Sequence, residues 1–263
     1  ANAFYTPEYK GSYLVASQTP IEKALKIAFT TNSPVGGAVH DECKEAVLKC
    51  VKLLEEQGHH VMEMEAPVDG MRVANSYITM YFAEVASGLN EIGKRIGRKV
   101  TMQDVEPTTW LLGLLGKVVN AEELLTSLKF WDEVAIQMEN FHDAYDLYIT
   151  PTTAFPASEI GELEPTSFEK SLIQVVGRLP LGKLIKKPVD DIIFKNLERT
   201  PYTQLANLTG QPAITMPLHV TKDGLPCGVQ VMARRGREDL LLQLAGQLEQ
   251  SSIWVDVKNN PNY

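Results

Sequence analysis

Few residues in this sequence have the types and spacing that a metal site requires. His40 and Cys43 lie three residues apart at the start of an expected helix, and Cys50 follows about two helical turns later. Both cysteines belong to the apolar stripe of that helix, where a cysteine usually packs as a small hydrophobic residue. His59 and His60 are neighbours in an expected strand, so their side chains point to opposite faces. With neither a Cys-x-x-Cys nor a His-Glu-x-x-His motif in the chain, we expect no metal and no other cofactor.

Nucleophilic and phosphate-binding motifs are also missing. No Gly-x-Ser-x-Gly turn occurs, and Ser33, which precedes Pro34, is typical of a turn residue. The Pro34–Gly37 segment leads into a helix but lacks the Lys-Ser/Thr pair of a phosphate loop. Neighbouring carboxylates such as Glu55 and Glu56 are typical of a solvated helix face. Residue types alone therefore assign no catalytic residue to this chain.

Composition excludes several classes of protein. The chain has 263 residues, of which 44% are hydrophobic and 22% charged, and this is ordinary for a globular protein. A net charge of −8 argues against a nucleic-acid partner, whose phosphates require clustered Lys and Arg. No apolar run reaches the roughly 18 residues of a membrane span, so we expect no membrane partner. Three cysteines and no signal-peptide pattern indicate a reducing, cytoplasmic location.

The first part of the chain alternates between expected strands and an expected helix. Residues 25–29 form a short apolar run that predicts a buried strand, and residues 60–65 predict a second strand. The segment between them predicts a helix that ends near Gly58. A strand–helix–strand unit favours a parallel pair within an α/β sheet. The apolar stripe of the helix comprises Cys43, Ala46, Val47, Cys50, Val51 and Leu54.

The rest of the chain is predicted to be helical first and then to return to strands. Residues 71–145 predict helices that break at Gly97 and near Asn120, with Thr101 and Asp104 as a helix N-cap. Asp223-Gly224 between two apolar runs predicts a β-hairpin. We expect four parts: an irregular lead-in (1–24), an α/β part with a helical region (25–155), a Pro-punctuated surface excursion (156–199), and C-terminal strands with a closing helix (200–263).

Several motifs in family order resemble the amidase signature family. Residues 200–218 and 223–233 resemble its C-terminal signature, and Tyr145–Thr153 resembles its Tyr-Asp, apolar, Thr-Pro-Thr strand. Residues 25–29 and 39–43 are similar to earlier parts of the same pattern, as are 53–59 and 66–70. The likeness covers about residues 25–155 and 198–254 and is closest to bacterial amidases of the 6-aminohexanoate-cyclic-dimer hydrolase kind.

The resemblance implies an α/β fold, a mixed open sheet flanked by helices, of which this chain supplies the C-terminal portion. Family members hydrolyse carbon–nitrogen amide bonds with two Ser and one Lys, and backbone N–H groups hold the oxyanion. These groups lie in a Gly-Gly-Ser-Ser-Gly-Gly-Ser type stretch of the N-terminal half, which this sequence lacks. The resemblance therefore implies no catalytic residue here. It also implies that the chain is inactive alone, with the N-terminal half of the same enzyme as partner and a small-molecule amide as substrate.

The resemblance further implies that Tyr81, Thr152 and Thr153 line the acyl side of the substrate pocket. The alternatives are that Tyr81 is a core residue and that the two threonines only cap a loop. Three functional alternatives stay open. The chain is a non-catalytic partner subunit of a split amidase, or it is a ligand-binding module, or the 156–199 excursion carries a binding surface of its own.

Overall fold

The computed structural model describes residues 9–163 and 197–256. The chain divides into two compact units. Unit 1 comprises residues 1–73, 132–157 and 198–263, and unit 2 comprises residues 74–131 and 158–197. Most of the predicted 156–199 excursion lies outside the described residues.

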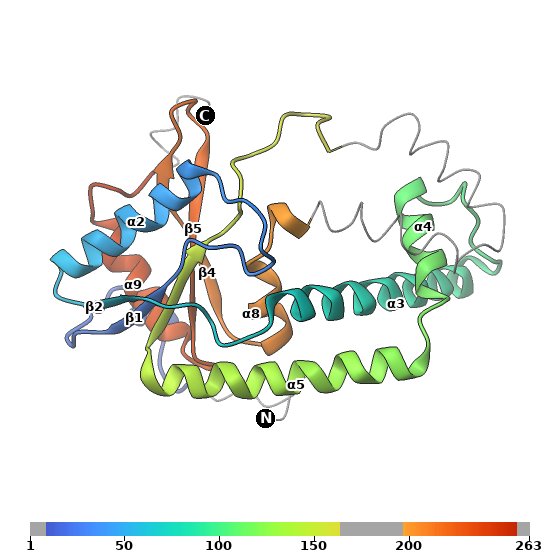
Figure 1. The fold of residues 1–263 in the computed structure, drawn as a ribbon, viewed down its shortest axis with the longest axis horizontal. Coiled ribbons are helices and arrows are strands. Elements are labelled where there is room, and N and C mark those ends of the chain that lie inside the picture. The colour runs from blue at the N-terminus through green and yellow to red at the C-terminus, as the bar shows by residue number, and fades with distance from the viewer. Residues whose placement is uncertain (1–8, 164–196, 257–263) are drawn as a thin grey trace. The chain divides into compact units, whose positions relative to one another are not determined.

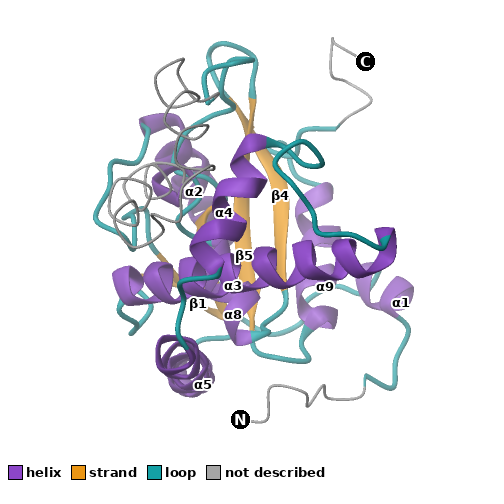
Figure 2. Ribbon diagram, turned by 90° about the vertical axis from the view of Figure 1, so that its right-hand side faces the viewer, coloured by secondary structure: helices purple, strands orange, loops and turns teal. Residues whose placement is uncertain are grey.

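Unit 1 is built on a five-stranded mixed sheet, drawn in orange in Figure 2. β1 is parallel to both of its neighbours, β2 and β3, while β5 is antiparallel to β3 and to β4. This confirms the predicted fold class of a mixed open sheet flanked by helices. In spatial order the strands are β2 (His60–Glu63), β1 (Lys26–Phe29), β3 (Leu147–Pro151), β5 (Pro226–Ala233) and β4 (Ala213–Val220).

The helix α2 (Asp41–Glu56) connects the parallel strands β1 and β2, as predicted. Asp41 and Glu42 lie in its first turn, where the helix dipole favours negative charge. Gly58 follows the helix with φ of 93°, a left-handed conformation that a glycine adopts without strain. The predicted apolar stripe is confirmed, because all six of its residues are buried: Cys43, Ala46, Val47, Cys50, Val51 and Leu54.

One face of the sheet carries the main hydrophobic core. The helices α2 and α9 (Glu238–Glu249) pack against this face, through alternate strand residues such as Ile27, Ile149 and Val231 (Figure 1). The short helix α1 (Tyr13–Ser17) packs on α9. On the opposite face, the Phe141 ring at the end of α5 (Ala121–Ala144) lies 5.4 Å from the ring of Tyr148.

The predicted hairpin joins β4 to β5. Thr221 donates its backbone N–H to the carbonyl of Leu225 at 2.8 Å, and Gly224 adopts φ of 79°. The pairing register shifts between Met216 and His219, around Pro217, whose missing N–H suits an irregular position in a strand. The helix α8 (Thr203–Thr209) precedes β4 and ends at a left-handed Gly210.

Unit 2 contains most of α3 (Gly70–Ile96), all of α4 (Pro107–Gly116) and the first part of α5. The predicted break near Asn120 is confirmed, since its side chain accepts the N–H of Glu123 at 2.9 Å and caps α5. The predicted N-cap at Thr101 is wrong. Thr101 does bond to Asp104, but both residues lie in a non-helical turn before α4. None of the described helices combines the length and the apolarity needed to cross a bilayer.

Candidate functional site

Chemistry-bearing side chains gather at one edge of the sheet in unit 1. Because β1 and β3 are parallel, their carboxyl ends share an edge, and ligands of open α/β sheets bind at such edges. The antiparallel β5 begins at this edge, where Val229 pairs with Pro151 at the end of β3. The amino end of α2 reaches it as well, because His40 donates its N–H to the carbonyl of Ala154 at 2.8 Å. We call this region the carboxyl edge.

Thr152 and Thr153, both predicted pocket residues, lie at the carboxyl edge directly after β3. The Thr152 hydroxyl donates to the Thr215 hydroxyl at 3.2 Å, and its backbone N–H donates to the carbonyl of Gly228 at 3.2 Å. The Thr153 hydroxyl donates to the carbonyl of Phe155 at 2.8 Å. Neither hydroxyl donates to a basic group in the described residues, so neither has the partner that makes a hydroxyl nucleophilic.

Gly228 lets these threonines come together. A β-carbon at this position would lie 2.5 Å from Cγ2 of Thr215 and 3.1 Å from Oγ1 of Thr152. Ordinary carbon–carbon contacts are about 3.5–4.0 Å, so any larger residue would push the two side chains apart. Gly228, Thr152 and Thr215 therefore form a small, close-packed surface from three strand ends.

A buried polar group lies beside this surface. The Gln230 amide donates to the Thr150 hydroxyl at 3.3 Å and to the Tyr202 carbonyl at 3.4 Å. The Tyr202 hydroxyl is buried without a hydrogen-bond partner in the described residues. Burial raises the pKa of Tyr202 and raises that of Tyr148 to about 12, so both phenols stay neutral.

Two cysteine thiols complete the core of the carboxyl edge. Sγ of Cys43 in α2 lies 3.4 Å from Sγ of Cys227 in β5, and both side chains are buried. The shared hydrogen bond and burial raise the pKa of the Cys43 thiol. Cys43 is therefore a packing residue rather than a thiolate nucleophile.

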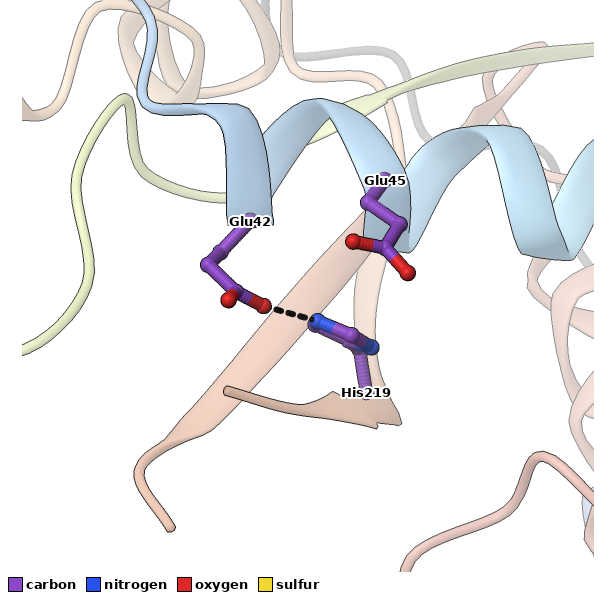
Figure 3. A group of neighbouring side chains, drawn as sticks. All are labelled: Glu42, Glu45 and His219. Carbon is purple, nitrogen blue, oxygen red and sulfur yellow. Dashed lines mark hydrogen bonds and ion pairs between the residues drawn. The ribbon is translucent and has the colours of Figure 1, made fainter. Parts of the chain in front are cut away.

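A second group of ionisable side chains connects α2 to the end of β4 (Figure 3). The buried His219 ring donates from Nε2 to the Glu42 carboxylate at 2.7 Å. On its other side, the Lys49 ammonium lies 3.3 Å from Nδ1 and 2.8 Å from the carboxylate of Glu45. Because an ammonium only donates, Nδ1 of His219 is the acceptor in its contact with Lys49. The bond from His219 also holds the pKa of Glu42 below its usual value.

The same group offers three metal ligands, since atoms of Glu42, Glu45 and His219 lie within 4.8 Å of one another. Lys49 already supplies the positive charge that these ligands would attract. Its ammonium also faces Nδ1, the ring atom that must carry a proton when Nε2 binds a metal. The arrangement is therefore a network in which the His219–Glu42 hydrogen bond ties α2 to β4 and Lys49 pairs with Glu45, and it fits a resident metal poorly.

Tyr81, the third predicted pocket residue, lies on α3 in unit 2, whereas Thr152 and Thr153 belong to unit 1. Its side chain is 46% exposed, so the alternative that Tyr81 is a core residue is wrong. Its ring stacks on Tyr77 with centroids 6.1 Å apart. The pocket role of Tyr81 stays a prediction.

Sequence reasoning missed Thr215, Gly228 and the Glu42–His219 contact. Glu42 and Glu45 are three residues apart on a helix, which signals only a shared face. His219 lies 177 residues further along the chain, and no local pattern links it to Glu42. These contacts depend on strand order, which periodicity does not specify.

Comparison with known proteins identifies the family. Residues 5–242 match the model of the family described as Amidase. The chain is 34% identical over 234 residues to lipoamidase from Enterococcus faecalis, which covers 87% of this chain and 31% of that protein. It is 32% identical over 235 residues to 6-aminohexanoate-cyclic-dimer hydrolase from Pseudomonas sp. (strain NK87), covering 88% of this chain and 45% of that protein.

A solved structure agrees with these sequences. The structure of 6-aminohexanoate cyclic dimer hydrolase complexed with substrate matches with a TM-score of 0.80 and 29% identity. The match covers 98% of this chain and 51% of that one. The chain therefore spans about a third to a half of the length of the relatives that it matches.

Proposed function

This chain belongs to the amidase family, and from that premise we propose that it forms the C-terminal part of a hydrolase of carbon–nitrogen amide bonds. In this proposal the two Ser and one Lys of the reaction come from an N-terminal segment that the sequence does not contain. The chain contributes the carboxyl edge, where Thr152 and Thr153 line the acyl side of the pocket for a small-molecule amide.

The observation that carries the proposal is the chemistry of the carboxyl edge. Its hydroxyls bond to one another and to backbone carbonyls, and its histidine is held between Glu42 and Lys49. In the described residues no serine hydroxyl is hydrogen-bonded to a lysine amine. An edge that is shaped by close packing but has no activated nucleophile fits a surface completed by another segment.

The exposed side of β4 supports such a partner. The strand is at the edge of the sheet, and Ala213 and Thr215 are exposed on the face opposite the main core. Long edge strands present unpaired backbone N–H and C=O groups, which pair readily with another strand. In β4 the Pro217 carbonyl already accepts the N–H of Val255 at 2.8 Å, so the docking segment would pair with the first part of the strand. Thr215 belongs both to this strand and to the close-packed surface, so a segment docked along β4 would also contact Thr152.

A fluorophosphonate probe, which labels activated serines, tests the proposal directly. The purified chain is treated with the probe and its intact mass is measured, with full-length 6-aminohexanoate-cyclic-dimer hydrolase as the positive control. We expect the control to gain one adduct and this chain to gain none. A stoichiometric adduct on this chain alone would show that it holds its own nucleophile, and the proposal would fail.

Reconstitution tests the positive half of the proposal. In this test an N-terminal portion of the Pseudomonas enzyme is fused ahead of this chain. We expect the fusion to label and to hydrolyse an aryl amide, and each part alone to do neither. The matched control carries Thr152→Val, which removes the hydroxyl but keeps the shape. A reduced kcat/KM with retained labelling places Thr152 in the pocket, whereas an unchanged kcat/KM removes it.

A further inference from the structure

A cavity in unit 2 has a composition unlike the rest of this acidic chain. It has a volume of about 800 Å³, within the range of about 300–1,000 Å³ that is typical of small-molecule sites. It lies around the end of α3 and against α4, entirely within unit 2. Its described lining comprises Leu89, Asn90, Gly93, Lys94, Gly97, Arg98, Lys99, Val100, Trp110 and Lys117.

The charges in this lining are all positive. Lys94, Arg98, Lys99 and Lys117 contribute to it, and among the described residues no carboxylate does, although the whole chain has a net charge of −8. Arg98 is neutralised by Asp104 through two hydrogen bonds of 2.6 and 2.8 Å. The three lysines form no ion pair within the described part of the chain. They therefore leave a concentrated positive charge at the cavity.

Backbone and side-chain contacts restrain two of these cations, Arg98 and Lys117. The helix α3 ends at Gly97, whose φ of 73° reverses the chain, and Arg98 returns its N–H to the carbonyl of Gly93 at 3.2 Å. The bidentate pair with Asp104 then fixes the segment that carries Lys99. Opposite this turn, Nζ of Lys117 lies 5.6 Å from the centre of the Trp110 ring. A pre-formed site of this kind lowers the entropic cost of binding.

Helix dipoles explain only part of this charge. Lys94 lies in the last turn of α3 and Lys117 caps α4, where a cation is favourable. Each helix end carries about half a negative charge, so two ends amount to about one charge against three lysines. Lys99 lies outside both helices. A positive excess remains, and it faces a cavity whose lining also includes the apolar side chains of Leu89, Val100 and Trp110.

We propose that this cavity binds a small organic polyanion, whose phosphate or carboxylate groups contact Lys94, Lys99 and Lys117. The site belongs to unit 2, whereas the carboxyl edge belongs to unit 1, and the proposal does not depend on amide hydrolysis. Ammonium groups on flexible stems suit several anionic oxygens at once, as in other phosphate sites that use lysine.

Calorimetric titration of the full chain tests the proposal, with inorganic tripolyphosphate and citrate as probes. We expect one of them to bind with 1:1 stoichiometry, and its Kd to rise with NaCl because salt screens exposed charges. Stronger binding of tripolyphosphate assigns phosphate as the ligand chemistry, and stronger binding of citrate assigns carboxylate. Circular dichroism of each variant checks that it is folded.

Lysine variants locate the site. The triple variant Lys94→Gln/Lys99→Gln/Lys117→Gln is expected to weaken binding at least tenfold. Lys52→Gln, on the exposed side of α2, is the matched control and should leave the Kd unchanged. Absence of binding to the unaltered chain at 10 mM of either probe overturns the proposal. So does equal weakening by a triple variant of lysines elsewhere, which would show a diffuse charge effect.

Discussion

Replacing Gly228 by alanine tests whether the strand ends are packed as closely as the structure shows. The added β-carbon would lie 2.5 Å from Cγ2 of Thr215, more than 1 Å inside an ordinary contact. Overpacking of this kind costs about 1–3 kcal/mol. Alanine also lowers the conformational entropy of the unfolded chain, and this stabilises the folded state by about 0.4–1 kcal/mol. We therefore expect Gly228→Ala to lower the free energy of unfolding by about 1.3 kcal/mol, the midpoint of a range of about 0–2.6 kcal/mol.

A second substitution isolates the cause. Thr215→Ser removes Cγ2 and leaves Oγ1 of Thr152, at 3.1 Å, as the nearest atom to the new β-carbon. In that background Gly228→Ala should change the unfolding free energy by less than about 0.5 kcal/mol, because the clash is gone. Urea unfolding followed by circular dichroism measures all four proteins.

A matched control is available in α3. A β-carbon at Gly88 meets nothing within 4 Å, so Gly88→Ala should stabilise by about 0.5–1 kcal/mol through helix propensity. If Gly228→Ala lost the same stability in the unaltered chain and in the Thr215→Ser background, the reasoning would be refuted, since Cγ2 would then not be the obstacle.

Three further outcomes are expected. Burial lowers the pKa values of His59 and His142, so the unfolded chain binds protons that the folded chain refuses, and the unfolding free energy should fall as pH drops below about 6.5. The unfolding free energy should change by at most about 1.4 kcal/mol per pH unit for each histidine. Urea titrations that show equal stability at pH 7.5 and 5.5 would contradict this prediction. His219→Ala should cost about 1–3 kcal/mol in thermal unfolding, because it leaves the Glu42 carboxylate without its buried donor, whereas Glu42→Gln keeps an acceptor and should cost less. Ellman's reagent should label no cysteine in the native chain and three in denaturant, since all three are buried and the pKa of Cys50 is raised to about 12; rapid native labelling would count against this packing.

Local periodicity predicted the parts of the fold that depend on neighbouring residues. The buried stripe of α2 follows from apolar residues three and four positions apart. Because these residues lie on one face of the helix, that is the face that packs against the sheet. The turn at Gly224 and the helix break near Asn120 are also predicted, because each depends on residues within a few positions of one another. The N-cap prediction at Thr101 is wrong, because the same hydrogen bonds between Thr101 and Asp104 occur in a helix N-cap and in a turn outside a helix.

The candidate site depends on strand order, and that is where sequence reasoning stopped. The family resemblance predicts Thr152 as a pocket residue. It does not predict its hydrogen-bond partner Thr215, which is 63 residues away and on a different strand. The Cys43–Cys227 and Glu42–His219 contacts span 184 and 177 residues. Each exists only because β5 returns antiparallel beside β3 and brings β4 with it.

The sequence by itself determined the class of fold, the family and the absence of a local catalytic motif, because these are carried by short patterns. Only the tertiary structure decided which side chains meet. The Thr221–Leu225 turn fixes how β4 pairs with β5, but no local pattern fixes the order of the other strands, which depends on burying one sheet face against α2 and α9. That burial sets Gly228 between two threonines and His219 between Glu42 and Lys49. It thereby places the chain's polar groups at one edge of the sheet.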